Sequence, residues 1–177
     1  MTKRSKVLIV DDRMENLIAL ENTLSEMDVE VLKATSGNDA LTLSLKNDFA
    51  MAILDVQMPE MDGFELADLL RGDPKTSRLP IIFLTAAYGE QEHIYKGYEA
   101  GAVDYIVKPY NAQVLIAKVT IFLDLHRQRI DLAEKVNALA ASEERFRSLV
   151  MTVPDIVYRI DTDGRFTFLN DAIFILG

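Results

Sequence analysis

The sequence predicts an α/β protein with a doubly wound, five-stranded parallel sheet. Five short apolar runs rich in Val and Ile lack polar alternation, which is typical of strands buried on both faces of a parallel sheet. Segments with helical spacing of apolar residues separate these runs, and a repeated strand–helix–strand order favours right-handed crossovers in one sheet. The predicted strands are Val7–Val10, Val29–Ala34, Met51–Leu54, Ile81–Leu84 and Tyr105–Val107.

The intervening segments predict the helices. In the first of them, Leu17, Leu20 and Leu24 recur at helical spacing. A last helix is expected to begin near Asn111, directly after Lys108-Pro109. The helices predicted before this last one are Met14–Met27, Asn38–Lys46, Phe64–Leu70 and Glu90–Ala100.

Composition narrows the classes of function. The net charge of −9 argues against a general affinity for nucleic acid. Residues 1–125 hold 12 Lys and Arg against 20 Asp and Glu, so most of the acidity belongs to the first domain. Cysteine is absent, which excludes disulfides and thiolate metal sites. The sequence has neither a membrane-spanning apolar run nor a signal-peptide pattern, and we therefore expect a cytoplasmic protein.

The last helix continues in a heptad pattern past the predicted sheet domain. Leu125, Leu132, Leu139 and Phe146 fall seven residues apart, and Phe122, Val136 and Val150 occupy the companion positions. Arg129 and Glu143 interrupt the apolar seam. The pattern favours a parallel dimeric coiled coil, and the alternative is a single long amphipathic linker helix.

A different pattern follows Pro154. Two strand-like runs, 155–161 and 165–170, flank an Asp-Gly turn and predict a β-hairpin. A hairpin with a short tail cannot bury a core of its own. We therefore expect the second unit to be incomplete and the sequence to be part of a longer protein.

Polar side chains follow four of the predicted strands. Asp11 and Asp12 end the first strand, Asp55 the third, Thr85 the fourth and Lys108 the fifth. In a doubly wound sheet, ligands gather beyond the carboxyl ends of the strands. We therefore expect these side chains to converge on one edge of the sheet.

The chemistry of this group favours phosphoryl transfer. Crowded carboxylates repel one another, and a hard divalent cation such as Mg²⁺ relieves the repulsion. Asp55 could then act as an oxygen nucleophile and form an aspartyl-phosphate. Mg²⁺ and the Lys108 ammonium would neutralise charge on the phosphoryl oxygens, while the Thr85 hydroxyl and the small Ala86 would provide a hydrogen bond and room.

Four motifs in this order resemble the receiver domains of two-component response regulators, a flavodoxin-like fold. The resemblance covers residues 6 to about 125. The motifs are Val-Leu-Ile-Val-Asp-Asp (7–12), Leu-Asp-Val-Gln-Met-Pro-Glu-Met-Asp-Gly (54–63), Phe-Leu-Thr-Ala (83–86) and Gly-Ala-Val-Asp-Tyr-Ile-Val-Lys-Pro-Tyr (101–110).

The resemblance implies a role for each matching residue. Asp55 would be the phosphoacceptor, and Asp12 would ligate Mg²⁺ directly, with Asp11 acting mostly through water. The backbone carbonyl of Gln57 would be a further ligand. Thr85, Ala86 and Lys108 would hold the phosphoryl group, and Thr85 would move together with Tyr105 as the switch. The family also implies the strand order 2-1-3-4-5.

A second resemblance covers about 35 residues after the heptads. The segments Ser142–Val150, Pro154–Asp161 and Phe168–Ala172 look like the beginning of a PAS sensor domain, with an ordinary hairpin as the alternative. The expected organisation is thus a receiver at 1–125, a coiled-coil-like signalling helix at 126–150 and a truncated PAS segment at 151–177.

These resemblances lead to a signalling hypothesis. A histidine kinase or phosphotransfer protein would phosphorylate Asp55, and the helix over 111–150, which is also the expected homodimer contact, would carry the change to PAS and an output domain. We expect that output to be a histidine kinase, with a diguanylate cyclase as the alternative. This segment itself is not expected to turn over substrate. A phosphatase of the haloacid dehalogenase class is the competing enzyme hypothesis, but Asp55-Val56-Gln57 lacks its second acid.

Overall fold

The computed structural model describes residues 4–86, 104–152 and 157–170 of the 177-residue chain. The chain divides into two compact units, Met1–His126 and Arg127–Gly177, and each is described by itself. The helix predicted at Glu90–Ala100 lies outside the described residues.

The first unit is built around a parallel sheet of five strands, as predicted. The strand order is β2-β1-β3-β4-β5, which is the flavodoxin-like order that the receiver resemblance implied. In register, Val10 of β1 pairs with Ala34 of β2 and Leu54 of β3, so β1 lies in the interior of the sheet. The strands are β1 (Ser5–Val10), β2 (Val29–Ala34), β3 (Met51–Asp55), β4 (Ile81–Ala86) and β5 (Asp104–Lys108).

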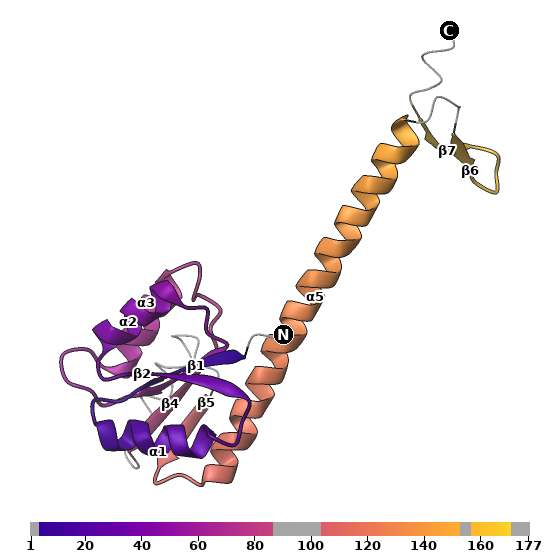
Figure 1. The fold of residues 1–177 in the computed structure, drawn as a ribbon. Coiled ribbons are helices and arrows are strands. Elements are labelled where there is room, and N and C mark those ends of the chain that lie inside the picture. The colour runs from indigo at the N-terminus through magenta and orange to yellow at the C-terminus, as the bar shows by residue number, and fades with distance from the viewer. Residues whose placement is uncertain (1–3, 87–103, 153–156, 171–177) are drawn as a thin grey trace. The chain divides into compact units, whose positions relative to one another are not determined.

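Helices cover both faces of this sheet (Figure 1). Because successive strand residues point to opposite faces, Val7 and Ile9 pack toward α1 and the start of α5, whereas Leu8 and Val10 pack toward α2 and α3. All four of these residues are fully buried. The helices are α1 (Met14–Leu24), α2 (Gly37–Lys46), α3 (Gly63–Gly72) and α5 (Ala112–Thr152).

Side-chain caps fix where two of these helices begin. The Ser36 hydroxyl accepts a hydrogen bond from the Asp39 amide at the start of α2. Asp62 and Glu65 form a capping box at the start of α3, with distances of 2.8 and 3.2 Å. Each cap satisfies backbone N–H groups that have no partner within the helix.

The helix α5 contributes its first turns to the core of the first unit. Leu115, Val119, Phe122 and Leu123 are buried there. The heptad pattern had placed Phe122 in a coiled-coil seam, but its side chain packs in this core instead. From Leu125 onward the apolar positions of α5 are largely exposed.

The second unit contains the predicted hairpin, with shorter strands than expected. β6 (Tyr158–Ile160) pairs with β7 (Phe166–Leu169) in antiparallel fashion. At the turn, the Asp161 carboxylate accepts hydrogen bonds from the amides of Asp163 and Arg165, both at 2.9 Å. The buried Asn170 side chain donates to the carbonyl of Val150 at 3.1 Å, which joins the hairpin to the last turn of α5.

Candidate functional site

The two acidic residues after β1 differ in exposure. Asp11 is fully buried, whereas Asp12 is exposed. The backbone amide of Arg13 donates to Oδ1 of Asp11 at 2.9 Å, and Nδ2 of Asn16 lies 2.8 and 2.9 Å from its two carboxylate oxygens. The chain turn after β1 therefore fixes the Asp11 carboxylate and leaves Asp12 facing solvent.

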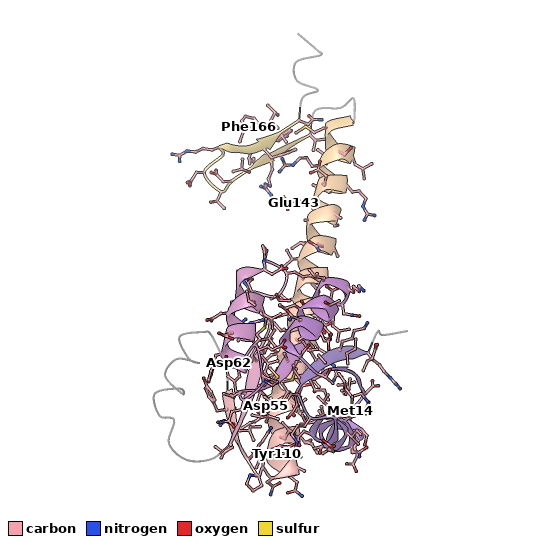
Figure 2. All side chains as sticks on the ribbon, turned by 90° about the vertical axis from the view of Figure 1, so that its left-hand side faces the viewer. Met14, Asp55, Asp62, Tyr110, Glu143 and Phe166 are labelled. Atoms are coloured by element: carbon pink, nitrogen blue, oxygen red, sulfur yellow. The ribbon has the colours of Figure 1, made fainter. Side chains whose placement is uncertain are left out.

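Asp55 ends β3 and is buried (labelled in Figure 2). Its backbone lies between β4 and the start of α3. The next residue, Val56, donates its amide to the carbonyl of Leu84 at 3.0 Å and accepts from the amide of Gly63 at 3.0 Å. A Cβ atom on Gly63 would lie 2.3 Å from the Asp55 carbonyl oxygen, so only glycine allows this approach.

Lys108 brings a positive charge to these carboxylates from the end of β5. Its ammonium donates to Oδ2 of Asp11 at 3.0 Å and to Oδ1 of Asp55 at 2.9 Å. The strand register explains the meeting, because Asp55 pairs with Leu84 on β4 and Lys108 pairs with Ala86, two residues further along that strand. Residues 97 positions apart in the sequence thus share one hydrogen bond.

The electrostatics of the group show an excess of negative charge. Burial raises the pKa of Asp55; the nearby Lys108 lowers it in part, and Asp11 and Asp12 add to the rise. Burial disfavours the charged form of Lys108, but its hydrogen bonds to Asp55 and Asp11 outweigh this and raise its pKa. Among the described residues, Lys108 contacts Asp11 and Asp55 but not the nearby Asp12, so negative charge exceeds positive charge in this group, which favours binding of a further cation.

The three carboxylates are close enough to share a metal ion. One oxygen from each of Asp11, Asp12 and Asp55 can be chosen so that all lie within 4.8 Å of one another. An all-oxygen donor set with few carboxylates suits a hard divalent cation that keeps some of its water. The residues present therefore fit Mg²⁺.

Thr85, Ala86 and Gln57 also lie at the carboxyl edge of the sheet, at or just beyond the ends of β4 and β3. The half-buried Thr85 donates its hydroxyl to the carbonyl of the exposed Ala86 at 3.3 Å. Gln57 is exposed two residues after Asp55, and the ligand role of its carbonyl stays a prediction.

Tyr105 is half-buried on β5, and β4 lies between this strand and β3, which carries Asp55. Its ring centroid lies 5.4 Å from that of Phe83, which in turn lies 4.8 Å from Phe64 of α3. This row of rings connects β5 to α3 through β4. Tyr105 thus has an aromatic neighbour toward which its ring packs, and its role as a switch stays a prediction.

Sequence reasoning missed two contributors to the site. Asn16 was not expected to contact Asp11, although an amide side chain in the first turn of the helix after an acidic pair was the available signal. Gly63 entered the sequence analysis only as the last residue of the motif at 54–63, whereas the structure shows that it makes room for the backbone of Asp55.

A flavodoxin-like sheet with an acidic site at the carboxyl ends of its strands defines a class of α/β ligand-binding proteins. Residues 7–120 match the family described as the response regulator receiver domain, and the chain belongs to this family. Over 119 residues it is 38% identical to the transcriptional regulatory protein SrrA of Staphylococcus aureus, covering 67% of this chain and 48% of that protein. The chain thus spans about half the length of this relative.

Solved structures show the same similarity. The chemotaxis protein CheY4 of Vibrio cholerae is 32% identical, with a TM-score of 0.64, and the match covers 68% of this chain and all of that one (100%). The signal receiver domain of a signal transduction histidine kinase from Syntrophus aciditrophicus is 30% identical, with a TM-score of 0.62, covering 68% of this chain and 90% of that one. The first unit is therefore the receiver domain of a two-component system, a phosphoacceptor module.

No helix in the described part of the chain is long and apolar enough to cross a bilayer.

Proposed function

We propose that Asp55 is the phosphoacceptor and that its phosphorylation is the input of this protein. Receiver domains interact with histidine kinases or phosphotransfer proteins, and such a protein would be the donor. The observation that carries the proposal is the position of the Asp55 carboxylate, which is buried, 2.9 Å from the Lys108 ammonium and in reach of a shared cation with Asp11 and Asp12.

The chemistry follows from this position. A carboxylate oxygen of Asp55 attacks the phosphorus atom, a new P–O bond forms, and the bond between phosphorus and the donor breaks. The donor atom, a histidine nitrogen or an acyl oxygen, leaves with the electron pair. Lys108 stabilises the negative charge that remains on the phosphoryl oxygens, and the Thr85 hydroxyl and Ala86 lie at the same sheet edge to receive them.

Asp12, Asp55 and the carbonyl of Gln57 would bind the Mg²⁺ ion directly, and Asp11 would act on it mostly through water. When bound, the cation would supply positive charge that offsets the repulsion between Asp55 and the incoming phosphoryl group. The raised pKa of Asp55 supports a need for this charge, because Lys108 alone does not compensate the three carboxylates.

We further propose that Thr85 and Tyr105 form the switch. The Thr85 hydroxyl binds only a backbone carbonyl at 3.3 Å in the described structure, so a phosphoryl oxygen could replace that weak partner. Tyr105 would then turn with it, since the two residues belong to the paired strands β4 and β5. The outcome would be a changed surface on the receiver domain.

The helix α5 is the proposed route to the rest of the protein and the proposed homodimer contact. Its exposed apolar residues keep heptad spacing, with exposures between 47 and 70%. These residues are Leu125, Leu132, Val136, Leu139 and Phe146. The segment at 151–177 would begin a PAS domain, and the output would be a histidine kinase.

Labelling with acetyl phosphate tests the assignment of Asp55. The chain should incorporate phosphate in the presence of Mg²⁺, and incorporation should fail when a chelator removes the cation. Asp55→Asn should abolish incorporation. Asp39→Asn makes the same change at an acidic residue in the first turn of α2 and should leave incorporation unchanged. Full labelling of Asp55→Asn would show that another residue is the acceptor.

Sedimentation equilibrium tests the dimer, with and without beryllofluoride as a phosphoryl analogue. Leu132→Arg combined with Leu139→Arg should weaken association, because it places charge in the proposed seam. Asp131→Arg, at a position outside the a and d set, serves as the control. A chain that stays monomeric under all conditions would contradict the dimer without affecting the assignment of Asp55.

A further inference from the structure

The three carboxylates of the site are not equally available to a cation. A carboxylate has about four lone-pair positions, two on each oxygen. Among the residues that the structure describes, no donor reaches the side chain of Asp12 or Oδ2 of Asp55. Asp11, in contrast, is surrounded by donors.

Four contacts occupy the Asp11 carboxylate. Oδ1 receives the Arg13 amide at 2.9 Å and Asn16 Nδ2 at 2.8 Å. Oδ2 receives Asn16 Nδ2 at 2.9 Å and the Lys108 ammonium at 3.0 Å. Because Nδ2 of Asn16 is nearly equidistant from both oxygens, it occupies the side of the carboxylate on which a cation would bind both oxygens at once.

Two of these donors also have a second role, one in the backbone of the fold and one at Asp55. The Arg13 amide belongs to the backbone at the start of α1, and Lys108 also serves Asp55. Asn16 is the donor that a side-chain substitution alone can remove. Its amide nitrogen must face Asp11, because an ionised carboxylate only accepts hydrogen bonds.

We propose that Asn16 is a positioning residue that keeps Asp11 out of direct contact with the cation and thereby sets the preference of the site for Mg²⁺ over Ca²⁺. The inference rests on the metal site of the proposed function. With Asp11 held back, Asp12 and Asp55 are the direct carboxylate ligands. Mg²⁺ is usually bound through one or two carboxylates and keeps several waters, whereas Ca²⁺ takes more protein oxygens in a looser shell.

Removal of the Asn16 amide should therefore favour the larger ion. Without this donor, Asp11 has free lone pairs on the side that faced Asn16 and can join the ligand set. Hydrogen bonds to charged groups are worth enough that losing one changes an affinity by about tenfold. The ratio of the dissociation constants for Ca²⁺ and Mg²⁺ should thus fall by about tenfold in the variant.

Calorimetric titration of the whole chain with MgCl₂ and with CaCl₂ tests this. Asn16→Leu keeps the size of the side chain and removes the donor, and Asn16→Ala removes both. Asn22→Ala, an exposed position on the same helix, is the matched control and should keep the original ratio. Both Asn16 variants should shift the ratio alike, and an unchanged ratio in a folded Asn16→Leu chain would overturn the proposal.

A crystal structure of the unsubstituted chain with Mn²⁺ provides a test that does not depend on variants. Asn16 should still contact both Asp11 oxygens, with water between Asp11 and the ion. Direct contact between Asp11 and Mn²⁺ would overturn the role given to Asn16. If the chain binds Mg²⁺ and accepts phosphate but the ratio is unchanged, this inference fails alone; if it does neither, the proposed function fails.

Discussion

Gly63→Ala should damage the site through the backbone, without removing any functional side chain. A Cβ atom at position 63 would lie 2.3 Å from the carbonyl oxygen of Asp55, 3.0 Å from its carbonyl carbon and 3.1 Å from Cα of Val56. Real Cβ atoms essentially never approach closer than 3.0 Å, so the two segments must separate by about 0.7 Å. The obstructing atoms are backbone, and no change of rotamer can relieve the overlap.

The magnitude follows from two opposing effects. Overpacking of this kind costs about 1–3 kcal/mol. The lower chain entropy of alanine in the unfolded state returns about 0.4–1 kcal/mol. Since rigid β3 and the start of α3 are both involved, we expect the upper part of the overpacking range and a net loss of about 2 kcal/mol in the free energy of unfolding.

Urea unfolding monitored by circular dichroism measures this loss. Gly72→Ala is the matched control at the other end of α3, because nothing lies within 4 Å of a Cβ atom there. That variant should be neutral or more stable by up to about 1 kcal/mol. Acetyl phosphate labelling of Gly63→Ala should also slow, since Asp55 is displaced. Equal stability of the two variants would refute the argument from close approach.

Three further substitutions test the charges and the caps. Burial raises the pKa of Asp55 above its unfolded value, so its ionised form costs stability above that pKa and the cost disappears as pH falls through it. Asp55→Asn should therefore melt at a higher temperature than the parent chain near pH 7, with the difference closing by about pH 3, and a lower melting temperature near neutrality would contradict this. Lys108→Ala leaves Asp11 and Asp55 without their counter-charge and should cost about 1–3 kcal/mol, below the value for a fully buried pair because Lys108 is 26% exposed. Added Mg²⁺ should restore part of that loss in thermal melts. If Mg²⁺ stabilises this variant no more than it stabilises the parent chain, Lys108 and the cation do not neutralise the same carboxylates. Asp62→Ala breaks the capping box of α3 and should lower the free energy of unfolding by about 1 kcal/mol in urea, whereas an unchanged midpoint would show that the cap contributes nothing.

The sheet and its acidic edge were predictable because their signals are local. Unbroken apolar runs mark strands buried on both faces, and the polar residue after each run necessarily lies at a strand end. Parallel topology alone places Asp11, Asp55 and Lys108 at one edge of the sheet, and the strand order and register then bring them into contact. The strand order did not follow from the residues, and it was carried by the resemblance of the motifs.

Other features depend on contacts that periodicity does not report. Phe122 and Leu125 fit one heptad pattern, yet Phe122 is buried in the receiver core and Leu125 is 47% exposed. The pattern shows which side of a helix is apolar and not what covers it. Asn16 similarly has an ordinary place in a helix, and only the fold shows that its amide reaches Asp11.

The strand order predicts that the acidic residues and the lysine of the site differ in how readily their strands open. Asp11 and Asp55 extend from β1 and β3, which have a hydrogen-bonded strand on each side, whereas Lys108 ends β5 at the border of the sheet. Backbone amides in interior strands are released to exchange with deuterium through larger openings than those at a border. Amide exchange should therefore be slower around the carboxylates than around the lysine. We therefore expect the acidic residues to stay in place in those local openings of the sheet border that release the lysine.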